Sequence, residues 1–157
     1  MTEEKPETSE FGSVDPAPAS VDADVSLLRE TLCDEDGRMF MRMRALFALR
    51  NLGGPESIDA LARGFESKSA LLKHEIAYVM GQMQESHAVQ HLIDRLSDPE
   101  EDLMVRHEAA EALGAIGDRT AMSTLESFRS DAEPVISESC EVAIDLLDWM
   151  QSKSVDY

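Results

Sequence analysis

The 157-residue sequence has few basic residues, few aromatic residues and only two cysteines. Its 14 Lys and Arg stand against 32 Asp and Glu, which gives a formal net charge of −18. Nucleic acids and anionic membrane surfaces both require a basic contact surface, so this balance argues against either as a partner and favours a cationic one. Two cysteines are too few for a disulfide framework and fit a reducing compartment.

The sequence also lacks any long apolar run, so no segment is expected to span a membrane. Its first residues, MTEEKPETSE, include no apolar stretch and are not expected to act as a signal or transit peptide, which favours a cytoplasmic protein. A Gly-rich phosphate loop, a Ser-His-Asp arrangement and a C-x-x-C motif are all missing. Aromatic residues make up 5% of the chain and there are nine Met, a composition that favours aliphatic helix packing over an aromatic-rich sheet.

Composition divides the chain into three parts. Residues 1–23 contain three of the six prolines, many acids and little to bury, so we expect a disordered acidic tail or linker. Residues 24–151 carry the helical periodicity and are expected to form one domain, and residues 152–157 a short tail.

An internal repeat identifies the fold class. The segments MRALFALRNLGG, HEIAYVMGQMQ, HEAAEALGAIG and CEVAIDLLDWM begin at Met43, His74, His107 and Cys140, with spacings of 31, 33 and 33 residues. Two helices in a repeat of this length are typical of a HEAT-type α-solenoid. We therefore predict an all-α fold of about four HEAT-like hairpins, or eight helices, with the second helices of the pairs near 38–52, 69–83, 102–116 and 134–150.

Two His-Glu pairs are the strongest candidates for chemistry. His74-Glu75 and His107-Glu108 occupy the same position in adjacent repeats, where stacked helices lie about 10 Å apart, so their side chains can approach one ion. Two imidazoles with one or two carboxylates give a mixed N/O site of the kind found in non-haem Fe(II) oxygenases. The alternatives are a solvated helix face, or a dipeptide copied by repeat duplication without function.

Other residues have two interpretations each. Gly81, seven residues after His74, leaves either an open channel floor or a close helix contact, and Met104 either fills a gap or lines a ligand pocket. Cys140 occupies the histidine position of the fourth repeat, where a buried structural thiol is favoured over a ligand. His87 and His91 have no acidic partner at matching register and are expected to be surface residues, with adventitious metal binding as the weaker alternative.

The strings SALLKHEIAYVMGQMQ and MVRHEAAEALGAIGD, together with SVDPAPA, RALFALRNLGG and ISESCEVA, resemble the deoxyhypusine hydroxylase family. The resemblance implies an iron-dependent monooxygenase that uses O₂ to hydroxylate the deoxyhypusine side chain of a translation initiation factor. It implies Fe(2+) ligands among His74, Glu75, His107 and Glu108. Glu75 would be either a ligand or the catalytic carboxylate facing the substrate amine, and Gly81 and Met104 would lie beside the substrate.

The family has two such halves in tandem, with four His-Glu pairs around two irons, whereas this chain has two pairs and resembles the C-terminal half. The resemblance thus implies one iron per chain, and a di-iron centre only with a missing N-terminal half or in a homodimer. Two alternatives are a metal-free HEAT scaffold whose acidic face binds a basic protein, and a bilin-lyase-like HEAT protein, since that family shares the A-A-x-A-L-G-x-I-G pattern.

Overall fold

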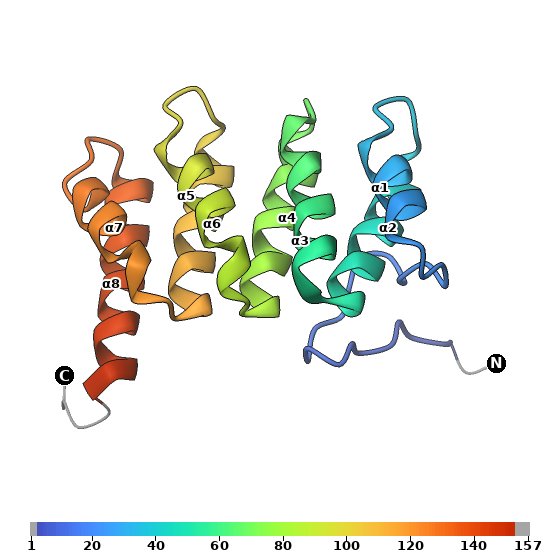
Figure 1. Ribbon diagram of the computed structural model, residues 1–157, viewed down its shortest axis with the longest axis horizontal. Coiled ribbons are helices and arrows are strands. Elements are labelled where there is room, and N and C mark those ends of the chain that lie inside the picture. Colours follow the sequence, from blue (N-terminus) through green and yellow to red (C-terminus); the bar gives the residue numbers. More distant parts are fainter. Residues whose placement is uncertain (1–2, 153–157) are drawn as a thin grey trace.

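A computed structural model describes residues 3–152, which form a row of antiparallel helix pairs (Figure 1). The α-helices are α1 (Val25–Cys33), α2 (Met39–Leu52), α3 (Gly54–Arg63), α4 (Ala70–Met83), α5 (Val89–Ser97), α6 (Leu103–Ile116), α7 (Met122–Phe128) and α8 (Pro134–Ser152). Single 3₁₀ turns, η1 (Gly64–Glu66), η2 (Ser86–Ala88) and η3 (Arg119–Ala121), join some of them. Within the described range the only β pairing is an isolated bridge between Thr8 and Val14. The prediction of an all-α HEAT-like solenoid is confirmed.

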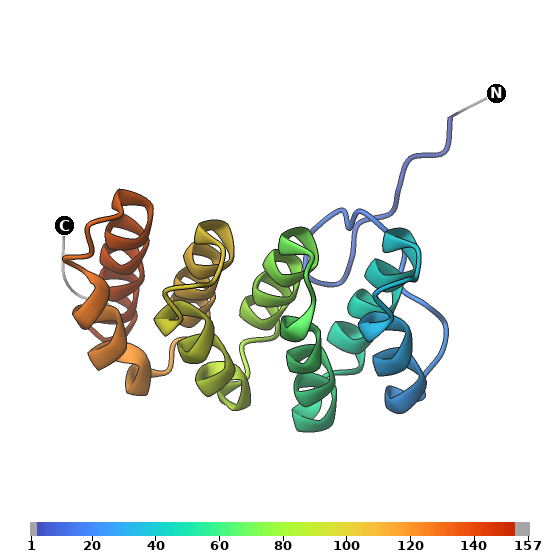
Figure 2. The same cartoon turned by 90° about the horizontal axis from the view of Figure 1, so that it is seen from above.

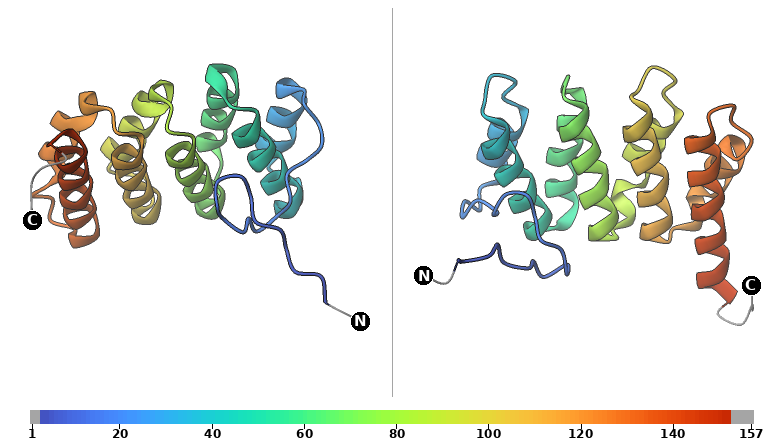
Figure 3. Two further views of the ribbon diagram at one scale, coloured as in Figure 1. Left: turned by 90° about the horizontal axis from the view of Figure 1, so that it is seen from below. Right: turned by 180° about the vertical axis from the view of Figure 1, so that it is seen from behind.

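The helices lie in two layers, with the first helix of each pair in one layer and the second helix in the other (Figures 2 and 3). In the second layer, α4 packs on α6 and α6 packs on α8. Glycines permit these contacts, because a Cβ on Gly81 would lie 3.1 Å from the Cα of Ala112, and one on Gly114 would lie 3.1 Å from the Cα of Ala143. The close-packing interpretation of Gly81 therefore holds, and Gly114 makes the equivalent contact between α6 and α8. The contact at Gly81 brings corresponding residues of α4 and α6 side by side.

Side-chain caps determine where α4 and α6 begin. The Ser69 hydroxyl accepts a hydrogen bond from the Leu72 backbone N–H (3.1 Å), and the Asp102 carboxylate accepts one from the Met104 N–H (2.9 Å). Because both helices start four residues before a His-Glu pair, His74 and His107 lie at equivalent heights in the stack.

A buried basic residue secures the end of the first helix in two of the pairs. Arg42 Nε donates to the carbonyl of Leu32 and Arg106 Nε donates to that of Leu96, each at 2.9 Å. Both carbonyls belong to the last turn of their helices, where no intrahelical N–H remains to bond them. The two arginines are in repeat register, so this contact belongs to the repeat itself.

The N-terminal segment differs in part from the disordered tail expected over residues 1–23. Asp15 forms a two-pronged ion pair with Arg50, with oxygen–nitrogen distances of 2.6 and 2.9 Å, and Arg50 is buried at the end of α2. Ser13 accepts a hydrogen bond from Gln82 of α4 (3.2 Å), so the segment crosses the ends of α2 and α4 (Figure 3). The physical reason is that a buried guanidinium requires a counter-charge, which the repeat does not supply.

The sequence analysis divided the chain into an N-terminal tail, a repeat domain and a C-terminal tail. Residues 1–2 of the N-terminal tail lie outside the described range. Of the expected C-terminal tail, residues 152–157, only Ser152 is described, and it belongs to α8. Among the described residues, no helix combines the length and hydropathy needed to cross a membrane.

Replacing Asp15 with alanine should destabilise the protein by about 3 kcal/mol, the lower end of the range for a broken buried ion pair, because it leaves the Arg50 guanidinium buried without its counter-ion while Gln82 still accepts a hydrogen bond from it. Burial raises the pKa of Asp15, but hydrogen bonds from Arg50 and Ser13 outweigh this and hold the pKa below its ordinary value. The stabilising effect of Asp15 should accordingly be lost as the pH falls through that lowered pKa. Urea unfolding measures both effects. The exposed Glu10→Ala in the same segment serves as the control, and equal losses in the two variants would contradict the prediction.

Candidate metal site between α4 and α6

Glu108 lies between the two histidines that the sequence analysis singled out. His74 Nε2 is 3.6 Å from Glu108 Oε1, and His107 Nε2 is 4.0 Å from Glu108 Oε2. The Glu108 side chain is buried, and its Oε2 has no hydrogen-bond partner among the described residues. A buried carboxylate oxygen without a partner is costly, so this atom lies where a cation would be stabilised.

The ring of His107 is held in one orientation by Ser139 of α8. His107 Nδ1 lies 2.6 Å from Ser139 Oγ, and the Ser139 hydroxyl donates its hydrogen to the Val135 carbonyl. Ser139 therefore accepts from His107, which places the proton of the neutral imidazole on Nδ1. Nε2 is left with its lone pair facing the Glu108 carboxylate, as a metal-binding histidine requires.

A second carboxylate, that of Glu111, joins this cluster. The sequence analysis missed this residue. Glu111 Oε1 lies 3.8 Å from His107 Nε2, and one donor atom from each of His107, Glu108 and Glu111 lies within 4.8 Å of the others. The signal was present in the sequence, because Glu111 follows His107 by four residues and so shares its helix face. Glu108 and Glu111 also line a pocket of about 300 Å³ that includes Gly81 and Tyr78.

The charges at the site favour a cation. Burial raises the pKa of the Glu108 carboxyl, His74 and His107 lower it, and the adjacent Glu111 raises it again, with a net upward shift. Two carboxylates, those of Glu108 and Glu111, thus lie beside two imidazoles, and their negative charge favours a bound cation. Two imidazole nitrogens and one or two carboxylate oxygens suit a divalent transition metal, and Fe(II) is among the ions that such a set holds.

The structure places Glu75 apart from this cluster. Glu75 is half-buried, burial raises its pKa, and the charged groups that act on it are His74, Asp15 and Arg50. Glu75 is not among the three residues, His107, Glu108 and Glu111, whose ligand atoms converge.

Among the other candidates, Gly81 lines the pocket and contacts Ala112, whereas Met104 is half-exposed and outside the residues that line that pocket. Cys140 is buried, and burial raises the pKa of its thiol to about 11. Because the thiolate is the form that binds metal, Cys140 does not extend the ligand series into the fourth repeat.

Comparison with known proteins finds HEAT-repeat families and deoxyhypusine hydroxylases. A model described as HEAT repeats matches residues 64–145, and one described as PBS lyase HEAT-like repeat matches residues 41–67. Deoxyhypusine hydroxylase of Rattus norvegicus is 48% identical over 92% of this chain, and that of Homo sapiens is 46% identical over 98%.

A solved structure of human deoxyhypusine hydroxylase in complex with glycerol superposes with a TM-score of 0.88 and 48% sequence identity, covering 92% of this chain and 50% of that one. The matched region is 48% of the rat sequence and 51% of the human sequence, so the chain spans about half the length of the curated relatives it matches.

Glu108→Gln should stabilise the metal-free protein at pH 8. The raised pKa of Glu108 means that the folded state binds protons more tightly than the unfolded chain, whose Glu pKa is about 4.3, so stability falls as the pH rises between the two values. The neutral amide removes this penalty, because it carries no charge to be desolvated. We expect the thermal midpoint to rise by about 2–4 °C, the shift that about 1 kcal/mol gives in a domain of this size, and by less at pH 4.

The matched control is Glu141→Gln. Glu141 occupies the same register position in α8 but is exposed, so its thermal midpoint should not change. The prediction that the buried Glu108 carboxylate destabilises the metal-free protein would be wrong if the thermal midpoint of Glu108→Gln fell, or if the midpoints of both variants rose equally.

Proposed function

The chain belongs to the HEAT-repeat family, and from its likeness to half of deoxyhypusine hydroxylase we propose that it is one half of an iron-dependent deoxyhypusine monooxygenase. The proposed reaction hydroxylates the deoxyhypusine side chain of a translation initiation factor to hypusine. The observation that carries the proposal is the buried Glu108 oxygen, which has no hydrogen-bond partner and faces the free Nε2 of His107.

In this proposal His74, His107 and Glu108 hold one Fe(2+), and Glu111 is available as a further carboxylate. When bound, the iron would supply O₂ activation. Ser139 keeps the proton of His107 on Nδ1 and so leaves Nε2 free for the metal.

The substrate side chain is an alkyl chain that ends in a protonated amine, and the pocket beside Glu108 has features that suit it. Ala112 and Ala115 give apolar walls, and Gly81 adds no side chain, so methylene groups can enter without displacing polar contacts. We also assign to Glu75 the role of binding the substrate amine, because it is a half-buried carboxylate next to His74 that belongs neither to the ligand cluster nor to the lining of this pocket. The half-exposed Met104 is assigned to the rim, near the entry of the protein substrate.

The chain supplies the ligands for one iron, so a di-iron centre would require a second half. We propose that this half is either an N-terminal counterpart or another copy of the chain in a homodimer. The net charge of −18 supports a basic protein substrate, because opposite charge accelerates the encounter.

Anaerobic titration of the full metal-free chain with Fe(II) tests the metal site. We expect one iron per chain, and an affinity at least about tenfold lower for His107→Ala and for Glu108→Gln, because each removes a ligand. Glu141→Gln should bind iron as the unaltered chain does. Iron binding that is the same in all four proteins would contradict the proposed ligands.

Hydroxylation of a deoxyhypusine-bearing substrate, measured together with solution mass, tests the reaction. We expect product from the iron-loaded homodimer, or from the iron-loaded chain mixed with the N-terminal half of a relative. If the chain binds iron but yields no product in either arrangement, the metal site stands and the monooxygenase assignment fails.

A further inference from the structure

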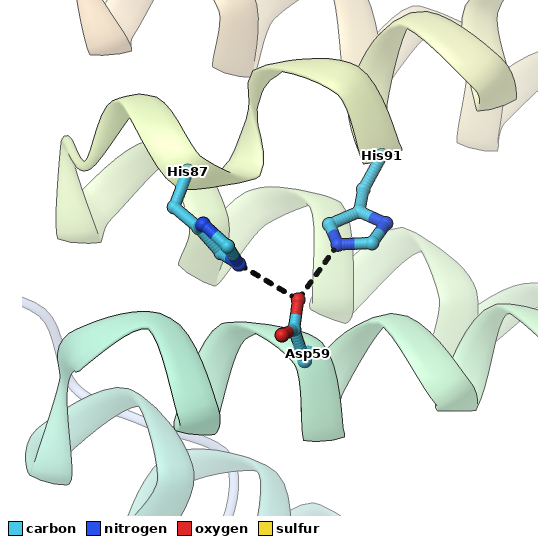
Figure 4. Close-up of side chains that lie close together, drawn as sticks. All are labelled: Asp59, His87 and His91. Atoms are coloured by element: carbon cyan, nitrogen blue, oxygen red, sulfur yellow. Dashed lines mark hydrogen bonds and ion pairs between the residues drawn. The ribbon is translucent and has the colours of Figure 1, made fainter.

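A second group of convergent ligand atoms lies in the other layer of helices. Asp59 Oδ1 is 2.8 Å from His87 Nε2 and 3.1 Å from His91 Nε2, so both rings point at one carboxylate oxygen (Figure 4). His87 lies in the turn η2 and His91 one helical turn later in α5, whereas Asp59 comes from α3 of the preceding pair. None of the three takes part in the cluster between α4 and α6.

The three residues have the donor types and spacing of a transition-metal site. Histidines four residues apart on one helical face are a recurrent zinc-binding pair, and a carboxylate is a common third ligand. In a tetrahedral zinc site with bonds of about 2.0–2.1 Å, ligand atoms lie about 3.3 Å apart. The nitrogen–oxygen distances of 2.8 and 3.1 Å are close to that value, so small side-chain rotations would admit an ion.

The environment also suits an ion with one open coordination position. The side chains of Asp59, His87 and His91 are 58%, 42% and 34% exposed, so water can reach a fourth position. Hydrogen bonds from His91 and His87 lower the pKa of Asp59, which keeps it ionised as a ligand must be. The acidic chain as a whole attracts divalent cations.

We propose that Asp59, His87 and His91 form a binding site for a borderline divalent metal ion, with Zn²⁺ as its representative, that links α3 to α5. In the ion-free protein the Nε2–H of each ring donates to the Asp59 carboxylate. On binding, that proton is exchanged through solvent to Nδ1, so each imidazole binds the ion through its Nε2 lone pair and nothing is oxidised or reduced. Because α3 and α5 belong to adjacent repeats, the ion joins two units that otherwise meet in this layer largely through η2.

The test is a titration of the full metal-free chain with ZnCl₂, followed by NMR of the histidine imidazoles. This readout separates the site from His74 and His107. We expect the His87 and His91 signals to shift together, and an affinity at these two rings at least about tenfold lower in Asp59→Asn. The matched control is Asp94→Asn, which removes an exposed acid from the same helix as His91 and should bind Zn²⁺ at these rings as the unaltered chain does.

Thermal unfolding gives an independent readout, since an ion bound only to the folded state raises the unfolding midpoint. Zn²⁺ should raise the midpoint of Asp94→Asn by more than that of Asp59→Asn. Unchanged His87 and His91 signals on addition of Zn²⁺, or equal affinity in the two variants, would overturn the proposal and leave Asp59 as a hydrogen-bond acceptor between helices.

Discussion

The close approach of α4 to α6 is the constraint on which the candidate site depends. Gly81 has no Cβ, and the Cβ of Ala112 occupies that space, so equivalent turns of the two helices lie at the same height. A larger side chain at Gly81 would push the helices apart and increase the distance from His74 to Glu108. Gly81 therefore permits the close approach of the two helices and also lines the pocket beside Glu108. Both the helix packing and the space in the pocket therefore require a residue without a side chain at Gly81.

The same close packing explains why a buried, partnerless carboxylate is tolerated. Glu108 is surrounded by helices that are stabilised by their own aliphatic contacts, such as those of Ile76, Met80 and Leu113, all fully buried. In a solenoid each repeat is stabilised mainly by contacts with its neighbours. These many apolar contacts offset the free-energy cost of burying the Glu108 carboxylate. An unsatisfied oxygen such as Glu108 Oε2 increases the gain from binding an ion, because ligands that already hydrogen-bond one another must first give up those bonds.

The helices that repeat along the chain could be predicted from the sequence, whereas most of the side-chain contacts between them could not. The repeat phase predicts α2, α4, α6 and α8 to within two residues at each end, because their apolar spacing repeats. Glu111 was missed although it follows His107 by one turn, and the partner of His91 was missed although Asp59 precedes it by 32 residues, within the range of the repeat spacing. Both signals were present but weak, since exposed acids are frequent in this chain. The pairing of Asp15 with Arg50 could not be predicted, because it joins a segment outside the repeats to a buried residue within them.

The repeat register also explains why the first and fourth repeats add no ligand to the cluster between α4 and α6. In the first repeat the positions equivalent to His74 and Glu75 are Met43 and Arg44, and the neighbouring acid Asp15 is already bound to Arg50. In the fourth repeat the equivalent of His107 is Cys140, whose buried thiol stays protonated at neutral pH. The candidate ligands of this cluster therefore lie on α4 and α6, and the equivalent positions in the first and fourth repeats add none to it. A second metal ion close to the first would need ligands that approach from outside the described helices, which is what a second half or a second copy of the chain would provide.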